Sequence, residues 1–357
     1  MSRRLLILST IALSACTVQR TAPPVVAAAA DDHAAHMRPE DRTLPAMSHG
    51  PSAEMSAVEQ GDLTIPASNA TAAARLAASP RHAEWVKFPS APGASDSIMA
   101  WVVYPKSSAK APVVVVVHEI FGLSTWVRAV ADQVAAEGFI AVAPDFLSRV
   151  RGGPSNETLV DSVATRLIRG VDAAERNRVV AAAANYGMML PAAQQKYAVI
   201  GYCWGGQTVF YHATNGGLKG FSGGVAFYGL GYMAGGTPAT ATTAAVPASP
   251  DADSLKKINV PVMLLNGTGD ARISAAMPAL DSIMKKLGKN YVGVNYEGAI
   301  HGFLRAQNDP RSPRAARGTA AAETQADVDR EQAANLAATK DGWPKTIAFL
   351  KKNLGVK

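Results

Sequence analysis

From about residue 85 to the C-terminus, the chain alternates between short apolar runs and longer segments with apolar residues at helical spacing. The five consecutive valines of Val113–Val117 are typical of a strand buried on both faces of a parallel sheet. Segments 126–137 and 171–189 have the length and spacing of helices. This order predicts an α/β fold, with a doubly wound, mostly parallel sheet and helices on both faces.

The same pattern gives a full set of expected elements. Strands are expected at residues 98–104, 113–117, 139–143, 197–200, 224–228, 260–265 and 291–296. Helices are expected at residues 126–137, 171–189, 204–214, 275–287 and 331–353, the last bent or restarted at Pro344. Two polar or small-residue stretches, 229–253 and 306–326, interrupt the pattern and are interpreted as long surface loops.

The N-terminus has the pattern of an export signal. Two arginines precede the apolar run Leu5–Leu13, and a small-residue site leads to Cys16. This predicts a bacterial lipoprotein signal at residues 1–15, which is removed, and lipidation of Cys16. A plain secretory signal is the alternative, since the run is too short to span a bilayer. Thr17, where an acidic residue would favour the inner membrane, favours the outer membrane and the periplasmic side of the envelope.

The amino-acid composition separates the rest of the chain into an expected tether and an expected domain. Residues 16–80 are rich in Ala, Pro, Ser and Thr, which predicts a tether without a fold of its own. Its His and Met residues have no regular spacing, so a linker is favoured over a soft-metal site. We expect residues 81–357 to form the catalytic domain.

Bulk composition narrows the function classes. With 48% hydrophobic and 18% charged residues among 357, the chain can enclose one large core. The formal charge is +7, but Lys and Arg are scattered, which argues against nucleic-acid binding. Only two cysteines, Cys16 and Cys203, are present. Lipidation of Cys16 leaves Cys203 as a lone thiol in an oxidising compartment, which favours a chemical use for it.

Cys203 lies in the sharpest motif of the chain, Gly-Tyr-Cys-Trp-Gly-Gly at residues 201–206. The motif follows an expected strand and opens an expected helix, as does the Gly-x-Ser-x-Gly nucleophile elbow, here with cysteine instead of serine. The glycines let the backbone pass close by, and the helix N-terminus favours a thiolate. The alternative is a glycine-rich turn with a buried, inert cysteine.

Two partners follow in the order nucleophile, acid, histidine. Asp270 comes after the expected strand 260–265, and His301 comes after the expected strand 291–296. Each alone is weak evidence, because Asp is common in turns and His on surfaces. Together they predict a catalytic triad in the chain order of an α/β-hydrolase. The loop after the five-valine strand is in the position that supplies one oxyanion-hole amide, so the amides of Ile120 and Trp204 are the candidates.

Here the sequence resembles the dienelactone hydrolase (carboxymethylenebutenolidase) family over most of residues 85–354. The motifs that carry the resemblance are His-Glu-Ile-Phe-Gly at 118–122, Ala-Pro-Asp-Phe at 143–146, the cysteine elbow, Gly-Asp at 269–270 and His-Gly-Phe-Leu-Arg at 301–305.

The resemblance implies that Glu119 pairs with the resting thiol and swings away when substrate arrives, and that Arg305 clamps a substrate carboxylate. A surface salt bridge is the alternative for Arg305. Tyr202, Phe303 and Trp126 are further candidates for substrate contact, although core packing would select them equally.

We therefore expect a monomeric hydrolase that cleaves a small ester or lactone through an acyl-cysteine intermediate, with no metal and no organic cofactor. The alternatives are a broad carboxylesterase or thioesterase, and a non-catalytic envelope lipoprotein that keeps the hydrolase core as a binding scaffold. Loss of hydrolysis on replacement of Cys203 distinguishes the enzymes from the scaffold.

Overall fold

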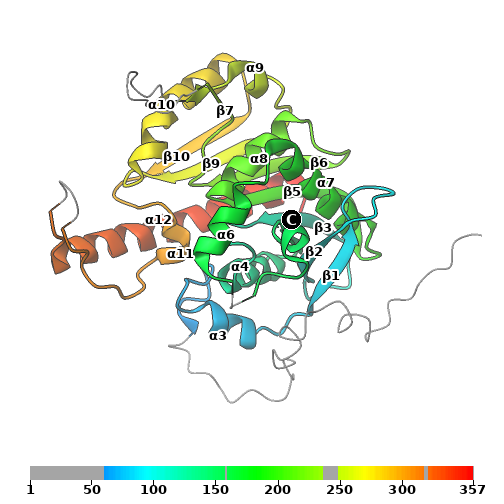
Figure 1. Ribbon diagram of the computed structural model, residues 1–357, viewed down its shortest axis with the longest axis horizontal. Coiled ribbons are helices and arrows are strands. Elements are labelled where there is room, and N and C mark those ends of the chain that lie inside the picture. Colours follow the sequence, from blue (N-terminus) through cyan, green and yellow to red (C-terminus); the bar gives the residue numbers. More distant parts are fainter. Residues whose placement is uncertain (1–59, 157–158, 236–247, 317–320, 357) are drawn as a thin grey trace, which may run out of the picture.

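The computed structural model describes residues 60–156, 159–235, 248–316 and 321–356 (Figure 1). The expected signal, Cys16 and most of the expected tether lie outside these residues.

An eight-stranded sheet has the order β1-β2-β4-β3-β5-β6-β9-β10. The pairs β1–β2 and β2–β4 are antiparallel, and all later neighbours are parallel. A separate two-stranded ribbon joins β7 to β8. The strands are β1 (Ala83–Pro89), β2 (Ser97–Val103), β3 (Ala111–Val117), β4 (Ile140–Asp145), β5 (Ala193–Tyr202), β6 (Phe221–Phe227), β7 (Met233–Ala234), β8 (Ser249–Pro250), β9 (Val262–Gly267) and β10 (Tyr291–Tyr296).

Helices lie between most of the strands and after the last one. They are α3 (Ala72–Ala77), α4 (Thr125–Ala136), α5 (Ser148–Arg151), α6 (Asp161–Ile168), α7 (Ala173–Met189), α8 (Trp204–Thr214), α9 (Ala252–Leu255), α10 (Ala271–Lys286), α11 (Phe303–Ala306) and α12 (Gln325–Leu354). Within the described ranges, no helix combines the length and the apolar character needed to cross a membrane.

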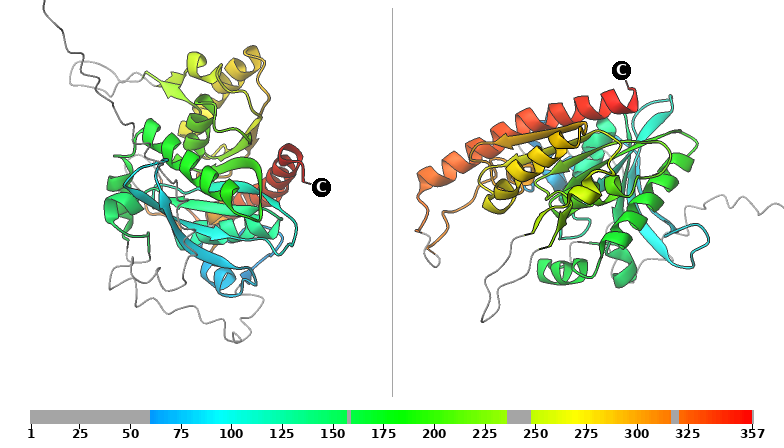
Figure 2. Two further views of the ribbon diagram at one scale, coloured as in Figure 1. Left: turned by 90° about the vertical axis from the view of Figure 1, so that its right-hand side faces the viewer. Right: turned by 90° about the horizontal axis from the view of Figure 1, so that it is seen from above.

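Helices cover both faces of the sheet, as the alternation predicted. Two adjacent glycines of β6 show this, because successive strand residues point to opposite faces. A Cβ at Gly223 would lie 3.2 Å from Phe349 of α12, whereas one at Gly224 would lie 2.5 Å from Val209 of α8. The view from above in Figure 2 shows α12 along one side of the molecule. All seven residues of β3 are buried, as the five valines indicated.

The structure moves the N-terminal boundary of the domain. Residues 60–78, which composition assigned to the tether, pack on α4 and on the segment after α11. Ile65, Ala67 and Ala72 are buried. A boundary at residue 80 was therefore wrong, because alanine-rich composition does not reveal which small residues enter a core.

Every predicted strand and helix is present, with shifted ends. The sequence interpretation missed the edge strand β1, the two-stranded ribbon of β7 and β8, and the short helices α3, α5, α6, α9 and α11. It also began the last helix too late and broke it at Pro344. In the structure α12 starts at Gln325 behind a capping box made by Thr324 and Asp327, and it continues through Pro344. The capping box provides hydrogen-bond partners for backbone N–H groups at the start of the helix, which the apolar pattern could not show.

Candidate active site

Cys203 occupies a strained turn between β5 and α8. Its backbone has φ 56° and ψ −114°, an unusual conformation for a residue with a Cβ. Its amide donates to the carbonyl of Phe227 at 3.0 Å, which fixes the turn to the neighbouring strand β6. The thiol is partly exposed and has no disulfide partner. The turn therefore presents the sulfur at the carboxyl edge of the sheet.

The glycines around the thiol are required by backbone contacts. A Cβ at Gly201 would lie 2.1 Å from the carbonyl oxygen of Gly205. One at Gly205 would lie 2.3 Å from the carbonyl oxygen of Val117 at the end of β3. No side chain fits at such distances. The two glycines therefore allow the turn at Cys203 to pack closely against the end of β3.

Asp270 and His301 meet at the same edge. Asp270 is the N-cap of α10, and its Oδ1 accepts from the amide of Ile273 at 3.3 Å. Its Oδ2 lies 2.5 Å from Nδ1 of His301, on the loop after β10. Cys203 lies at the same edge and is among the groups that raise the pKa of His301. The acid and the histidine are therefore in contact, whereas a triad completed by Cys203 stays a prediction.

The ionisable groups at this edge shift one another's pKa. Burial lowers the pKa of His301, but the interactions with Asp270 and Cys203 outweigh this effect and raise the pKa of His301 to about 9. Burial alone would raise the pKa of Asp270, yet the His301 ring holds that pKa below its usual range. His301 is therefore an imidazolium at neutral pH, next to a carboxylate and a sulfur.

Glu119 has a different partner from the one that the family resemblance implied. Its Oε2 lies 3.0 Å from Nε of Arg305, and its side chain is 3% exposed. Burial raises the pKa of Glu119, and Arg305 opposes that shift. A desolvated carboxylate needs a cation nearby, and the guanidinium of α11 supplies it. Arg305 thus forms a salt bridge, the type of contact that the sequence left open for it. Pairing of Glu119 with the resting thiol and an anion clamp at Arg305 stay predictions.

The candidate oxyanion amides belong to two segments in direct contact. Ile120 follows β3, and Trp204 is the first residue of α8. His118 fixes the first segment. The amide of Phe146 donates to its Nε2 at 3.1 Å, so its proton lies on Nδ1, which donates to the carbonyl of Glu119 at 2.6 Å. Burial lowers the pKa of His118, which keeps the ring neutral.

The three aromatic residues proposed to contact substrate lie under the site instead. Trp126, Tyr202 and Phe303 are each at most 1% exposed. The indole of Trp126 donates to the carbonyl of Ala67 at 2.8 Å and packs edge-on against Tyr202. Phe303 packs against Tyr228. Core packing, which the sequence could not distinguish from a pocket wall, explains all three.

Two residues near His301 were missed from the sequence. The ring of Tyr228 lies 5.1 Å from that of His301, at a φ of 37°, and its buried hydroxyl has no partner among the described residues. Asn335, buried in α12, accepts from the amide of Ile300 at 3.0 Å and so positions the histidine loop. The Phe-Tyr-Gly sequence at the end of the expected strand 224–228 was a signal for Tyr228, but nothing local marked Asn335.

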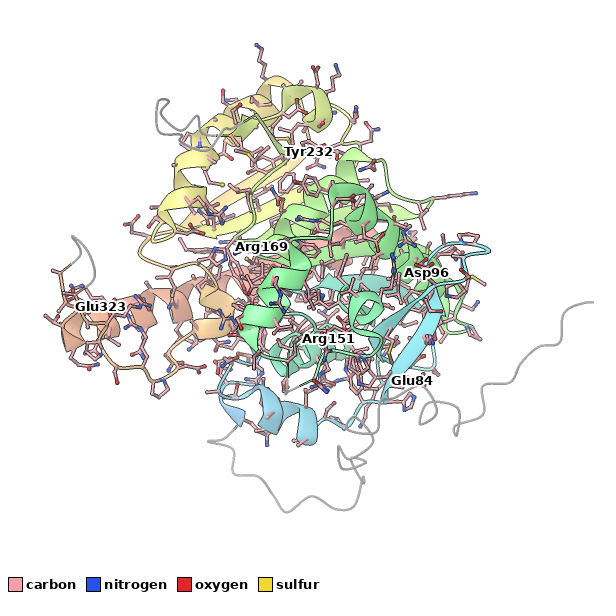
Figure 3. All side chains as sticks on the ribbon, viewed as in Figure 1. Glu84, Asp96, Arg151, Arg169, Tyr232 and Glu323 are labelled. Atoms are coloured by element: carbon pink, nitrogen blue, oxygen red, sulfur yellow. The ribbon has the colours of Figure 1, made fainter. Side chains whose placement is uncertain are left out.

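Two further sequence features bear on ligands. Arg166, in α6, and Arg169, just after it, are both exposed, and Figure 3 labels Arg169. Among the residues with described positions, no group of three or more His, Cys, Asp or Glu side chains is arranged to hold a metal ion.

A nucleophile turn followed by an acid and a histidine at the ends of later parallel strands defines an α/β-hydrolase. Residues 98–354 match the model of the dienelactone hydrolase family. The chain belongs to the dienelactone hydrolase family, and it is a hydrolase of that type.

Similar proteins agree with this assignment. A Salmonella typhimurium protein named "Putative carboxymethylenebutenolidase" is 26% identical over 75% of this chain and 87% of its own length. A Synechocystis protein with the same name is 27% identical over 60% of this chain and 84% of its own length. In fold, the chain is similar to a dienelactone hydrolase-like promiscuous phosphotriesterase from metagenomic libraries, with a TM-score of 0.52, 21% identity, and coverage of 76% and 98% of the two chains.

Proposed function

We propose that this hydrolase cleaves a small carboxylic ester or lactone through an acyl-cysteine intermediate. The observation that carries the proposal is the 2.5 Å contact between Asp270 and His301 at the sheet edge that also carries Cys203. Cysteine attacks as the thiolate, and an imidazolium nearby can donate a proton to the leaving oxygen.

The mechanism has two halves. In the first, the Cys203 thiolate attacks the carbonyl carbon, and the amides of Ile120 and Trp204 hold the oxyanion. His301 donates its proton to the leaving oxygen, which in a lactone stays attached to the acyl group. In the second, His301 takes a proton from water, the hydroxide attacks the thioester, and the acid and the thiolate are released. Asp270 orients the imidazole throughout.

Replacing Cys203 by Ala tests this mechanism. We expect the purified protein to lose hydrolysis of an activated aryl acetate by at least about a thousandfold, as removal of a nucleophile does in triad enzymes. Gly201 and Gly205 stay in place, so the fold should be kept, which circular dichroism checks. Turnover equal to that of the wild type would exclude Cys203 as the nucleophile.

The natural substrate is a separate question, and one contact favours a second candidate, a broad carboxylesterase. Arg305 is engaged by Glu119 in this conformation, so an anionic substrate has to displace that carboxylate to reach the guanidinium. Neutral esters face no such competition. Rates on an anionic dienelactone, an aryl acetate and a thioester separate the candidates, because a strong preference for the dienelactone supports an anion clamp at Arg305.

We further propose that the protein works at the periplasmic side of the cell envelope, anchored through lipidated Cys16. The support is the sequence pattern of residues 1–17 alone.

A further inference from the structure

Residues 60–78, here called the N-terminal strap, are a built element with its own internal anchor. Arg75 is 8% exposed although it carries a charge. Its guanidinium donates to the carbonyls of Gln60 and Ile65, each at 2.6 Å, and to that of Asp62. A buried arginine with every bond directed to main-chain carbonyls fixes the path of the strap.

The strap binds the segment that follows the catalytic histidine through three separate hydrogen bonds. The amide of Asn69 donates to the carbonyl of Arg305 at 2.9 Å. The side chain of Gln307 donates to the carbonyl of Pro66 at 2.8 Å. The amide of Ala70 donates to Oδ2 of Asp309 at 2.8 Å. The strap therefore covers the end of α11.

Among the residues that make these contacts, Gln307 has the most unusual backbone conformation. It is 5% exposed and has φ 43° and ψ −127°, a costly conformation for a residue with a Cβ. Its side-chain amide also donates to the carbonyl of Leu304 at 3.1 Å, at the end of the four-residue helix α11. Arg305 lies within that helix and faces Glu119 at 3.0 Å. The backbone that carries Arg305 is thus held by the strap.

We propose that the N-terminal strap positions Arg305 against Glu119 and thereby sets the arrangement of charges beside Cys203 and His301. Pro66, Asn69 and Gln307 act as positioning residues, through Arg305. The family match begins at residue 98, so the strap lies outside it. The consequence for turnover rests on the proposed hydrolysis, whereas the effect on α11 does not.

The test uses the full chain with Gln307→Glu, which keeps the size of the side chain but replaces the donor by a carboxylate facing two carbonyls. Amide hydrogen exchange in residues 302–309 should become at least about tenfold faster. For an aryl acetate, kcat/KM should fall about tenfold. The matched control is Gln195→Glu, whose amide donates to the carbonyl of Met188 at 2.6 Å far from the site; it should change neither quantity.

Two readouts separate positioning from general destabilisation. First, Gln307→Glu should have no further effect on kcat/KM in an Arg305→Ala background, since coupled residues are not additive. Second, the ratio of variant to wild-type kcat/KM should recover as the pH falls and the new buried carboxyl becomes protonated, because it then again has a proton to donate.

The outcomes are distinct. If Gln307→Glu does not fold, Asp309→Ala, which removes the acceptor of Ala70, should raise exchange in residues 302–309 in the same way. Unchanged exchange in a folded variant, or full additivity with Arg305→Ala, would overturn the positioning role. A wild type that hydrolyses no ester would refute the proposed function instead, and the exchange measurement would still decide the role of the strap.

Discussion

At the scale of single residues, the site depends on how each ionisable group is paired. Glu119 and Arg305 neutralise one another, which leaves His301 as the cation next to the sulfur. His118, two residues from the oxyanion candidate Ile120, is neutral. Its Nε2 accepts from the amide of Phe146 and its Nδ1 donates to the carbonyl of Glu119, and these two hydrogen bonds fix the loop. Two pairs of opposite charge therefore lie at the same edge of the sheet, His301 with Asp270 and Arg305 with Glu119.

The raised pKa of His301 predicts a dependence of stability on pH. The group's pKa rises from 6.5 to about 9 on folding. Its stabilising contribution is fully present below 6.5 and is lost as the pH rises through about 9. The Tm of the wild type should exceed that of His301→Gln at about pH 6, and the gap should narrow towards about pH 10. His82→Gln, at an exposed histidine, is the control. A gap that stays constant over this range would contradict the assignment.

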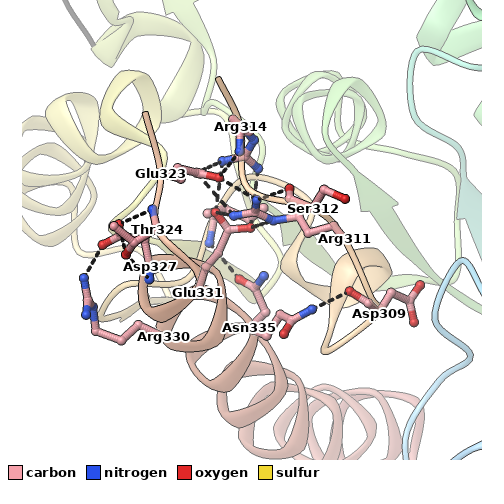
Figure 4. Close-up of polar contacts among 12 residues, drawn as sticks. Asp309, Arg311, Ser312, Arg314, Glu323, Thr324, Asp327, Arg330, Glu331 and Asn335 are labelled. Carbon is pink, nitrogen blue, oxygen red and sulfur yellow. Dashed lines mark hydrogen bonds and ion pairs between the residues drawn. The ribbon is translucent and has the colours of Figure 1, made fainter. Parts of the chain in front are cut away.

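At the scale of elements, α12 and the segment 303–316 form the support for the histidine loop. Arg311 and Arg314 of that segment pair with Glu323 and with Glu331 of α12 (Figure 4). These pairs are partly exposed, so each contributes little alone, but as a network they tie the segment to the helix. Both α12 and the strap therefore contact the segment around α11.

Asn335 allows this support to be measured. Asn335→Leu keeps the approximate volume but leaves the buried amide of Ile300 without its acceptor. We expect the free energy of unfolding in urea to fall by about 1–3 kcal/mol. We also expect kcat/KM to fall, because Ile300 adjoins His301. Asn353→Leu, at the far end of α12, is the matched control. Equal effects of the two substitutions would refute a special role of Asn335.

At the scale of the whole molecule, the sheet order brings distant parts of the chain to one edge. The loops after β3, β5, β9 and β10 carry the oxyanion candidate, the thiol, the acid and the imidazole. The sequence predicted this much because each residue follows a recognisable apolar run. It did not predict the ion pair between Glu119 and Arg305 or the strap, since both depend on contacts between segments far apart in the chain, which periodicity does not encode.

The proposed lipid anchor is a property of the whole chain. In cells of a bacterial host, we expect the wild type to fractionate with membranes and to carry acyl chains on Cys16, and we expect Cys16→Ser to carry none, as judged by mass spectrometry. Cys203→Ser, the control, should keep the anchor. Lipidation of Cys16→Ser would show that the anchor lies elsewhere.

The central claim, that Cys203 is acylated during turnover, is tested most directly by mass spectrometry of the protein quenched shortly after mixing with an activated aryl ester. The account predicts the added mass of one acyl group on the peptide that contains Cys203, and its absence in Cys203→Ala. Hydrolysis that proceeds with Cys203 unmodified at every quench time, or with the acyl group on another residue, would contradict it.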